Sequence, residues 1–202
     1  MKKQKSKYFR IILGALLVTL SAALCTGLWA RSQQQALSRE LIRLHVIAQS
    51  DTAEDQQLKL RVRDKTLMWL SPLLDKAENV QDAKEIIKEQ LPYLEVAAQR
   101  EIDKTGLSYG ASAVIENERY PTREYEGFAL PAGDYVSLKI TLGEGEGKNW
   151  WCVVFPPLCM AAVSEQEAFS ELSEESAELI SAQNGEYVLK FRIVEFFENI
   201  RG

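Results

Sequence analysis

Residues 136–157 read VSLKITLGEGEGKNWWCVVFPP, and this stretch decides the fold. From Val136 to Leu142 apolar residues alternate with polar ones, which is the pattern of a strand with one buried face. Residues 143–149 contain three glycines and predict a flexible turn. Residues 150–155 predict a second strand that ends at two prolines. We therefore expect the two strands to pair as a hairpin with a long, Gly-rich tip.

Helical patterns precede this stretch. Residues 40–48 are apolar and β-branched, so they predict a buried strand. Asp51 is then a plausible N-cap, with Glu54 in the capping-box position, and the helix that follows should end near Pro72. A second helical region should begin near Asn79, another good N-cap.

The region after Asn79 keeps helical spacing up to Gly106, the expected C-terminal stop. Pro92 interrupts it, which predicts a kink or two abutting helices. Residues 107–115 predict a strand and residues 120–134 a loop. Helices in the first half and a small antiparallel sheet in the second half give an α+β class.

The C-terminal stretch is less regular. A short helix is expected within residues 165–180. Residues 187–200 alternate like a strand at first and read as a helix later, so their pattern leaves both structures open.

The first thirty residues form a targeting element. Five basic residues within positions 2–10 precede residues 11–30, which carry no charge and would span about 30 Å as a helix. The basic flank should stay in the cytoplasm, so the rest is exported. A cleaved signal peptide and an uncleaved membrane anchor both fit, and the lack of a clean cleavage site favours the anchor. We divide the chain into this segment, a linker at 31–39 and a domain at 40–202.

The charge of the exported part restricts the classes of partner that it can bind. All 29 acidic residues and all but five of the 24 basic residues follow residue 30, so this part has a net charge of −10. Nucleic acids and anionic lipid headgroups bind basic surfaces. The composition therefore argues against either as the main partner. The sequence contains no motif for a cofactor or a small-molecule substrate, so we expect neither.

The search for catalytic groups yields little. His45 is the sole histidine, which excludes a metal site built on several histidines. It lies in an apolar run, where a hydrogen-bonded, partly buried imidazole is the simplest interpretation. The glycines of residues 143–148 alternate with glutamates and do not match a phosphate-binding loop. Catalytic, cofactor-binding and metal-binding residues are therefore predicted to be absent.

The cysteines and tryptophans near residues 150–159 each allow a structural interpretation. Cys152 and Cys159 are spaced closely enough to form a disulfide in an oxidising compartment, or they are two buried thiols. A nucleophilic cysteine paired with His45 is the enzymatic alternative. Trp150 and Trp151 are adjacent on a strand, so they should point to opposite faces, one inward and one outward. Cys25 lacks the small preceding residue of a lipidation site.

Several motifs resemble one known family. They are residues 43–51 (RLHVIAQSD), followed by Asp55-Gln56, Lys59 and residues 62–64 (VRD), then residues 120–125 (YPTREY), residues 130–135 (LPAGDY) and, most specifically, residues 143–159 (GEGEGKNWWCVVFPPLC). Together they are similar to stage II sporulation protein R, over about residues 41–160. The partner-binding candidates chosen on this basis are Arg43, His45, Asp51, Arg63, Asp64, Lys148, Asn149, Trp150, Trp151, Pro156 and Pro157.

The resemblance implies a function. Members of this family are made in the forespore and exported toward the mother cell, into the space between the two membranes. There they trigger a membrane-embedded aspartic protease that processes the precursor of sigma-E. A non-enzymatic signalling protein, secreted or anchored by its N-terminal segment, is therefore expected. The alternative is an exported hydrolase of cell wall or peptide that uses Cys152 or Cys159 with His45.

Overall fold

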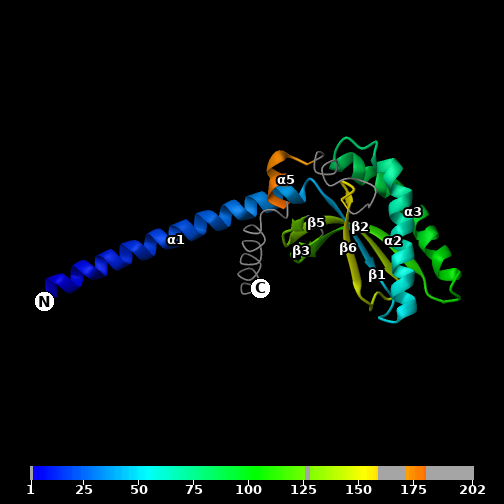
Figure 1. Ribbon diagram of the computed structural model, residues 1–202, viewed down its shortest axis with the longest axis horizontal. Helices are drawn as coiled ribbons and strands as arrows, with labels where there is room; N and C mark the ends of the chain where they lie inside the picture. Colours follow the sequence, from blue (N-terminus) through cyan, green and yellow to red (C-terminus); the bar gives the residue numbers. More distant parts are fainter. Residues whose placement is uncertain (1, 126–127, 159–171, 181–202) are drawn as a thin grey trace.

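The computed structural model describes residues 2–125, 128–158 and 172–180 (Figure 1). The helices are α1 (Lys2–Ser38), α2 (Ala53–Leu74), α3 (Val80–Asp103) and α5 (Glu174–Ile180). The strands are β1 (Ile42–Ile47), β2 (Ala111–Tyr120), β3 (Arg123–Glu124), β4 (Ala129–Leu130), β5 (Gly133–Leu142) and β6 (Asn149–Phe155). The predicted α+β class, with helices in the first half and most strands in the second, is confirmed.

The main sheet has the strand order β2-β5-β1-β6, and this order corrects the expected hairpin. β5 and β6 do not pair, because β1 lies between them, parallel to β5 and antiparallel to β6. The sheet is therefore mixed rather than antiparallel. β1 is the most thoroughly buried of these strands, and a central position pairs both of its edges. The Gly-rich loop must then cross about 10 Å, two strand spacings, over the end of β1.

The Gly-rich loop is docked on the chain after β1 rather than projecting as a flexible tip. Gly143 and Gly145 have φ values of 60° and 68°, which side chains rarely adopt. The Gly147 amide donates a hydrogen bond of 2.9 Å to the Ala48 carbonyl. A Cβ atom at Gly147 would lie 2.3 Å from the Ser50 carbonyl oxygen. The glycines therefore permit a close approach between two backbones.

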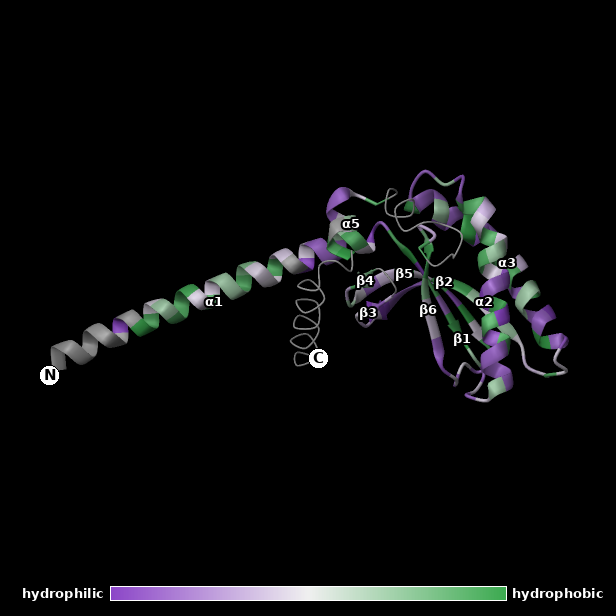
Figure 2. Cartoon of the chain, in the orientation of Figure 1, coloured by the Kyte–Doolittle hydropathy of each residue, from purple (hydrophilic) through white to green (hydrophobic). Residues whose placement is uncertain are grey.

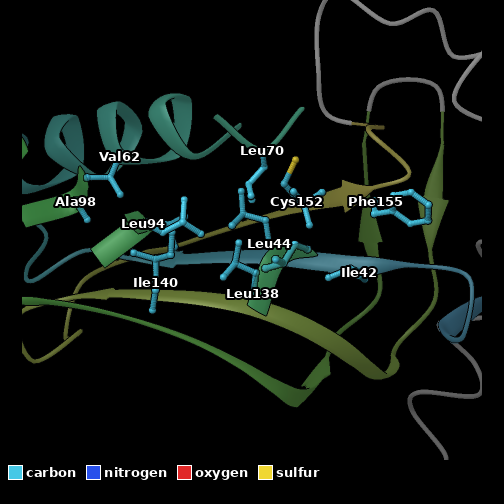
Figure 3. Close-up of a cluster of buried hydrophobic side chains, with 14 of the residues drawn as sticks. Ile42, Leu44, Val62, Leu70, Leu94, Ala98, Leu138, Ile140, Cys152 and Phe155 are labelled. Atoms are coloured by element: carbon cyan, nitrogen blue, oxygen red, sulfur yellow. The ribbon is translucent and has the colours of Figure 1, made fainter. Parts of the chain in front are cut away.

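The principal core lies between the sheet and the α2/α3 layer (Figure 3). Alternate residues of β1 point into it, as do apolar stripes of both helices. Val62 and Leu70 of α2 and Leu94 of α3 meet Leu44 of β1 there, all of them buried. Burial of each such side chain contributes about 1.5–3 kcal/mol to folding.

The helix boundaries depart in part from the sequence-based prediction. The N-cap of α2 is Thr52, whose hydroxyl accepts from the Asp55 amide at 3.3 Å, so the assignment of Asp51 was wrong. Asp51 instead accepts a hydrogen bond from the backbone amide of Lys148, at the end of the Gly-rich loop. Asn79 caps α3 as predicted, accepting from the Asp82 amide at 3.0 Å. Pro72 lies inside the last turn of α2 rather than ending it.

The end of α3 and the strand after it also differ in detail. Pro92 lies within one uninterrupted helix, so α3 does not split in two. Gly106 follows the helix with a φ of 75°, as expected of a stop signal. β2 begins at Ala111, later than predicted, and runs on to Tyr120. The expected loop at 120–134 contains the small β3/β4 pair.

A second, smaller core covers part of the opposite face of the sheet. The C-terminal end of α1, the β3/β4 pair and α5 pack there around Leu37, Leu41 and Tyr135. Most of the expected linker at 31–39 is thus helical, and Leu37 within it is fully buried. The sequence pattern marked only a change of composition at Arg31, whereas burial of Leu37 depends on contacts distant in the chain.

The rest of α1 extends away from the sheet, and its apolar residues from Ile12 to Trp29 are exposed (Figures 1 and 2). Within the described residues it is the one helix long and apolar enough to cross a membrane, over Ile12–Ser38. α5 falls within the short helix predicted at 165–180. Residues 159–171, and the stretch at 187–200, lie outside the described residues.

Candidate functional site

The two faces of β1 carry different kinds of side chain, apolar on one and mostly polar on the other. Leu44 points toward the helices together with its cross-strand neighbour Cys152. Arg43 and His45 point to the opposite face, where His45 is paired with Trp151. This division follows from the two-residue period of a strand. The candidate residues on β1 and β6 are therefore divided between two surfaces.

Arg43 is fully buried in a cage of tyrosines. Its guanidinium carbon lies 4.2 Å from the ring centre of Tyr120 and 5.2 Å from that of Tyr135. Nε donates to the Cys152 carbonyl at 3.0 Å, and Nη2 donates to the Tyr125 hydroxyl at 2.7 Å. Among the described residues no carboxylate pairs with it, and Nη1 has no hydrogen-bond partner. Arg43 is thus a structural cation held by ring faces.

His45 has both ring nitrogens engaged. Nδ1 lies 3.0 Å from Oε1 of Glu118, and Nε2 lies 2.8 Å from the side-chain oxygen of Asn149. Burial raises the pKa of Glu118, but hydrogen bonds from His45 and Ser137 and the charges of His45 and Lys139 outweigh it. The net effect lowers that pKa to about 2. Glu118 therefore stays ionised and fixes the imidazole.

The arrangement of Cys152 and His45 bears on the hydrolase alternative. The Cys152 side chain packs with Leu44 and Leu70 in the core between sheet and helices (Figure 3). His45 lies on the other face, so the pair does not form a nucleophile and its base. Cys159 lies outside the described residues, and its pairing with Cys152 stays a prediction. Within the described ranges no three His, Cys, Asp or Glu side chains cluster in a way that could hold a metal ion.

A second group of candidates meets at the loop end of the sheet, which we call the loop corner: residues 48–51, 59, 63, 64 and 143–150. Asp51 accepts a hydrogen bond of 2.8 Å from the Lys148 amide. Lys59 is buried and donates to the Lys148 carbonyl at 2.9 Å. Burial, the largest influence, lowers the pKa of Lys59. Lys59 was missed as a site residue, although the sequence places it in the matched segment.

Trp150 provides the exposed aromatic side chain of the loop corner. The guanidinium carbon of Arg63 lies 4.3 Å from its ring centre, and Asp64 pairs with Arg63 at 2.6 Å. The residue is 36% exposed. Trp151 points to the opposite face, as predicted, and is half-buried beneath Arg123, whose guanidinium carbon is 3.8 Å from a Trp151 ring centre. Neither tryptophan is enclosed by the main core.

The candidates thus fall into three groups. Six lie at the loop corner: Asp51, Arg63, Asp64, Lys148, Asn149 and Trp150. Arg43, His45 and Trp151 lie on the second face of the sheet. Pro156 and Pro157 follow the other end of β6 and are separate from both groups. Only the loop corner combines a rigid backbone arrangement with an exposed aromatic residue.

Comparison with known proteins identifies the family. The sequence model of the stage II sporulation protein R family matches residues 38–165. The chain is also 33% identical over 170 residues to stage II sporulation protein R of Bacillus subtilis (strain 168), covering 84% of this chain and 75% of that protein. The chain belongs to the stage II sporulation protein R family. No solved structure matches it.

The family segment contains all of the candidate residues. It begins at the end of α1, passes through the sheet and both central helices, and ends shortly after β6. Most of the apolar part of α1 precedes it. The loop corner and the tyrosine cage therefore both lie within the segment that the family model matches.

Proposed function

We propose that this chain is an exported sporulation signal that activates a membrane-embedded aspartic protease, which then processes the precursor of sigma-E in the mother cell. In this proposal α1 directs export and retains the chain in the membrane. The folded domain acts outside the cytoplasm by binding the protease and carries out no catalysis. Membership in the family and the apolar N-terminal helix support this assignment.

The observation that carries the binding role is the loop corner. Its backbone is fixed by Asp51 and Lys59, which both hold Lys148. This rigid support presents Trp150 beneath Arg63 at an exposed position. Tryptophan and arginine are the residues most enriched among side chains that dominate binding energy, especially where they are held in place before binding. We place the protease contact on this surface.

The state of His45 favours binding over hydrolysis. A general base needs a nitrogen within reach of the proton that it removes. Both nitrogens of His45 are engaged by Glu118 and Asn149. Cys152 is on the other side of the sheet, so the hydrolase alternative has no supporting contact among the described residues.

The test is co-expression of the full chain with the protease and the precursor of sigma-E, with cleavage as the readout. Trp150→Ala should reduce signalling, because loss of a central anchor costs about 2 kcal/mol or more, near thirtyfold in affinity. Trp69→Ala is a matched control, because Trp69 is 38% exposed and stacks on Tyr93 at 3.7 Å. The control should signal normally.

Two outcomes would count against the proposal. If the wild-type chain triggers no cleavage, the activating role is wrong. If folded Trp150→Ala protein signals as well as wild type, the loop corner is not the contact. A hydrolytic activity of the purified chain that disappears in His45→Ala would favour the enzymatic alternative.

A further inference from the structure

An exposed aromatic patch lies on the α2/α3 layer. Trp69 of α2 and Tyr93 of α3 stack there with their ring centres 3.7 Å apart, and Gln90 accepts a hydrogen bond of 3.0 Å from the Trp69 indole nitrogen. Met68 precedes Trp69, Val96 follows Tyr93 by about one helical turn, and these two side chains are 62% and 49% exposed. None of the four apolar side chains belongs to either core. The patch is therefore apolar surface that the fold of one chain leaves in water.

Four exposed residues of α3 continue this patch along the helix, and we call them the α3 stripe: Glu89, Tyr93, Val96 and Arg100. They are spaced by four, three and four residues, which is the spacing of the side chains along the seam of a coiled coil. The stripe lies outside the buried face of α3. Two apolar residues are thus aligned between an acidic residue on one side and a basic residue on the other.

The two charged residues of the α3 stripe have no partner of opposite charge within their own chain. Among the described residues, no ion pair or hydrogen bond involves the side chain of Glu89 or of Arg100. Lys104, one turn beyond the stripe, is by contrast paired with Glu101 at 2.6 Å. The stripe therefore presents one carboxylate and one guanidinium group that can each accept a partner from another molecule.

The order of these residues makes the α3 stripe complementary to itself. Its centre lies between residues 94 and 95, and Glu89 and Arg100 each lie about 8 Å from that centre along the helix axis, in opposite directions. A second α3 in antiparallel orientation would therefore place its own Arg100 opposite Glu89, and its own Val96 opposite Tyr93. A parallel copy would instead bring like charges together, which is unfavourable. A surface that complements itself in this way is the kind from which two-fold symmetric dimers form.

We propose that a second copy of this chain docks on the α3 stripe, antiparallel to the first, and that the two form a symmetric dimer. Two ion pairs between Glu89 and Arg100 then flank two contacts between Tyr93 and Val96. Trp69 supports Tyr93 within each chain by stacking on its ring. The stripe contributes only four side chains per copy, so the interface is small and the association is weak. The stripe shares no residue with the loop corner, and the inference does not depend on the proposed function.

The test is sedimentation equilibrium of the full chain in detergent at roughly 10–300 µM, where weak protein pairs become populated. We expect the wild-type chain to dimerise in this range. Glu89→Arg and Arg100→Glu each set like charges against one another, so each should raise the Kd of the dimer at least tenfold. The Glu89→Arg/Arg100→Glu double variant should return to the wild-type Kd. Lys88→Glu, at an exposed position about 100° around the helix from Glu89, is the matched control and should leave the Kd unchanged.

A mixture of the two single variants provides an independent check, because the surface of one complements that of the other. Native mass spectrometry with one variant labelled by nitrogen-15 should show mixed dimers, although neither variant dimerises alone. A wild-type chain that stays monomeric throughout the concentration range would overturn the proposal. Dimers that persist unchanged in both single variants would also overturn it, since α1 or another surface would then hold the chains together. So would folded double-variant protein and a mixture that both remain monomeric.

Discussion

The Nδ1 atom of His45 lies 3.0 Å from Oε1 of Glu118, across the second face of the sheet. The contact joins β1 to β2, two strands that are not neighbours, across Lys139 of the intervening β5. Glu118 also forms an ion pair with Lys139, whose Nζ lies 3.3 Å from Oε1 of Glu118. The contact therefore ties three strands together through one carboxylate, and its strength should depend on the ionisation of that group.

Acid should weaken the domain through Glu118. Its pKa falls to about 2 in the folded chain from the usual 4.5, so ionised Glu118 stabilises the fold above about pH 5. This contribution, on the order of 2–3 kcal/mol, should be lost as pH falls from about 4.5 toward 2. Glu118→Gln should therefore lower the free energy of unfolding at pH 6 and flatten its decline toward pH 3. Urea denaturation at several pH values measures both effects.

Glu116→Gln is the control for this prediction. Glu116 lies on the same face of β2 and pairs with Lys139 at 2.9 Å, but its side chain is exposed. The variant should keep the wild-type decline in stability with acid. Equal pH dependence of the wild-type and Glu118→Gln proteins would show that the His45–Glu118 contact contributes nothing.

The folded domain should include the end of α1. In a fragment of residues 31–202 we expect cooperative unfolding and good solubility. Leu37→Ala in that fragment should lower the free energy of unfolding by about 2–4 kcal/mol, because Leu37 is fully buried in the second core. Gln35→Ala, at an exposed position, should change it little. Identical urea midpoints for the two variants would place the domain boundary after residue 37.

The docking of the Gly-rich loop predicts a difference between two glycines. Gly147→Ala would place a Cβ atom 2.3 Å from the Ser50 carbonyl oxygen, so the two backbone segments must separate. We expect a loss of about 1–3 kcal/mol, or several degrees in Tm. Gly110→Ala has its nearest neighbour at 3.9 Å and should be nearly neutral. Equal Tm values for both variants in thermal melts would contradict a docked loop.

Cys152 and Cys159 should form a disulfide in the exported protein. Closure of so short a loop contributes roughly 2–3 kcal/mol on the chain-entropy model. Mass spectrometry of non-reduced peptides should show a linked pair with two hydrogens fewer than the free thiols. A Cys25→Ser background removes the third cysteine as a competing partner. Two thiols that alkylate freely in natively exported protein would refute the bond.

Much of the local structure could be predicted because its signals lie within a few residues. The alternation before Leu142 and the apolar run at 40–48 identified two strands of the sheet. Asn79 identified the start of α3, because an N-cap acts on the amide three residues later. The opposite orientation of Trp150 and Trp151 followed from the strand period alone.

The neighbours of each strand could not be predicted. Sequence proximity suggested that β5 and β6 pair, yet β1 separates them. Asp51 looked like a cap because the chemistry of its side chain fits one, but Lys148, distant in the sequence, takes it as a partner. In both cases a contact between distant segments outweighs a local preference, and no periodicity reports on such a contact.

The sequence by itself determined the apolar N-terminal segment, the family, the α+β class and the opposite orientation of Trp150 and Trp151. Only the tertiary structure decided which strand lies in the middle of the sheet, which residues gather at the loop corner and that Leu37 belongs to a core. The physical reason is that side-chain period and capping act over one or two turns. Strand order and burial depend instead on the packing of the whole chain.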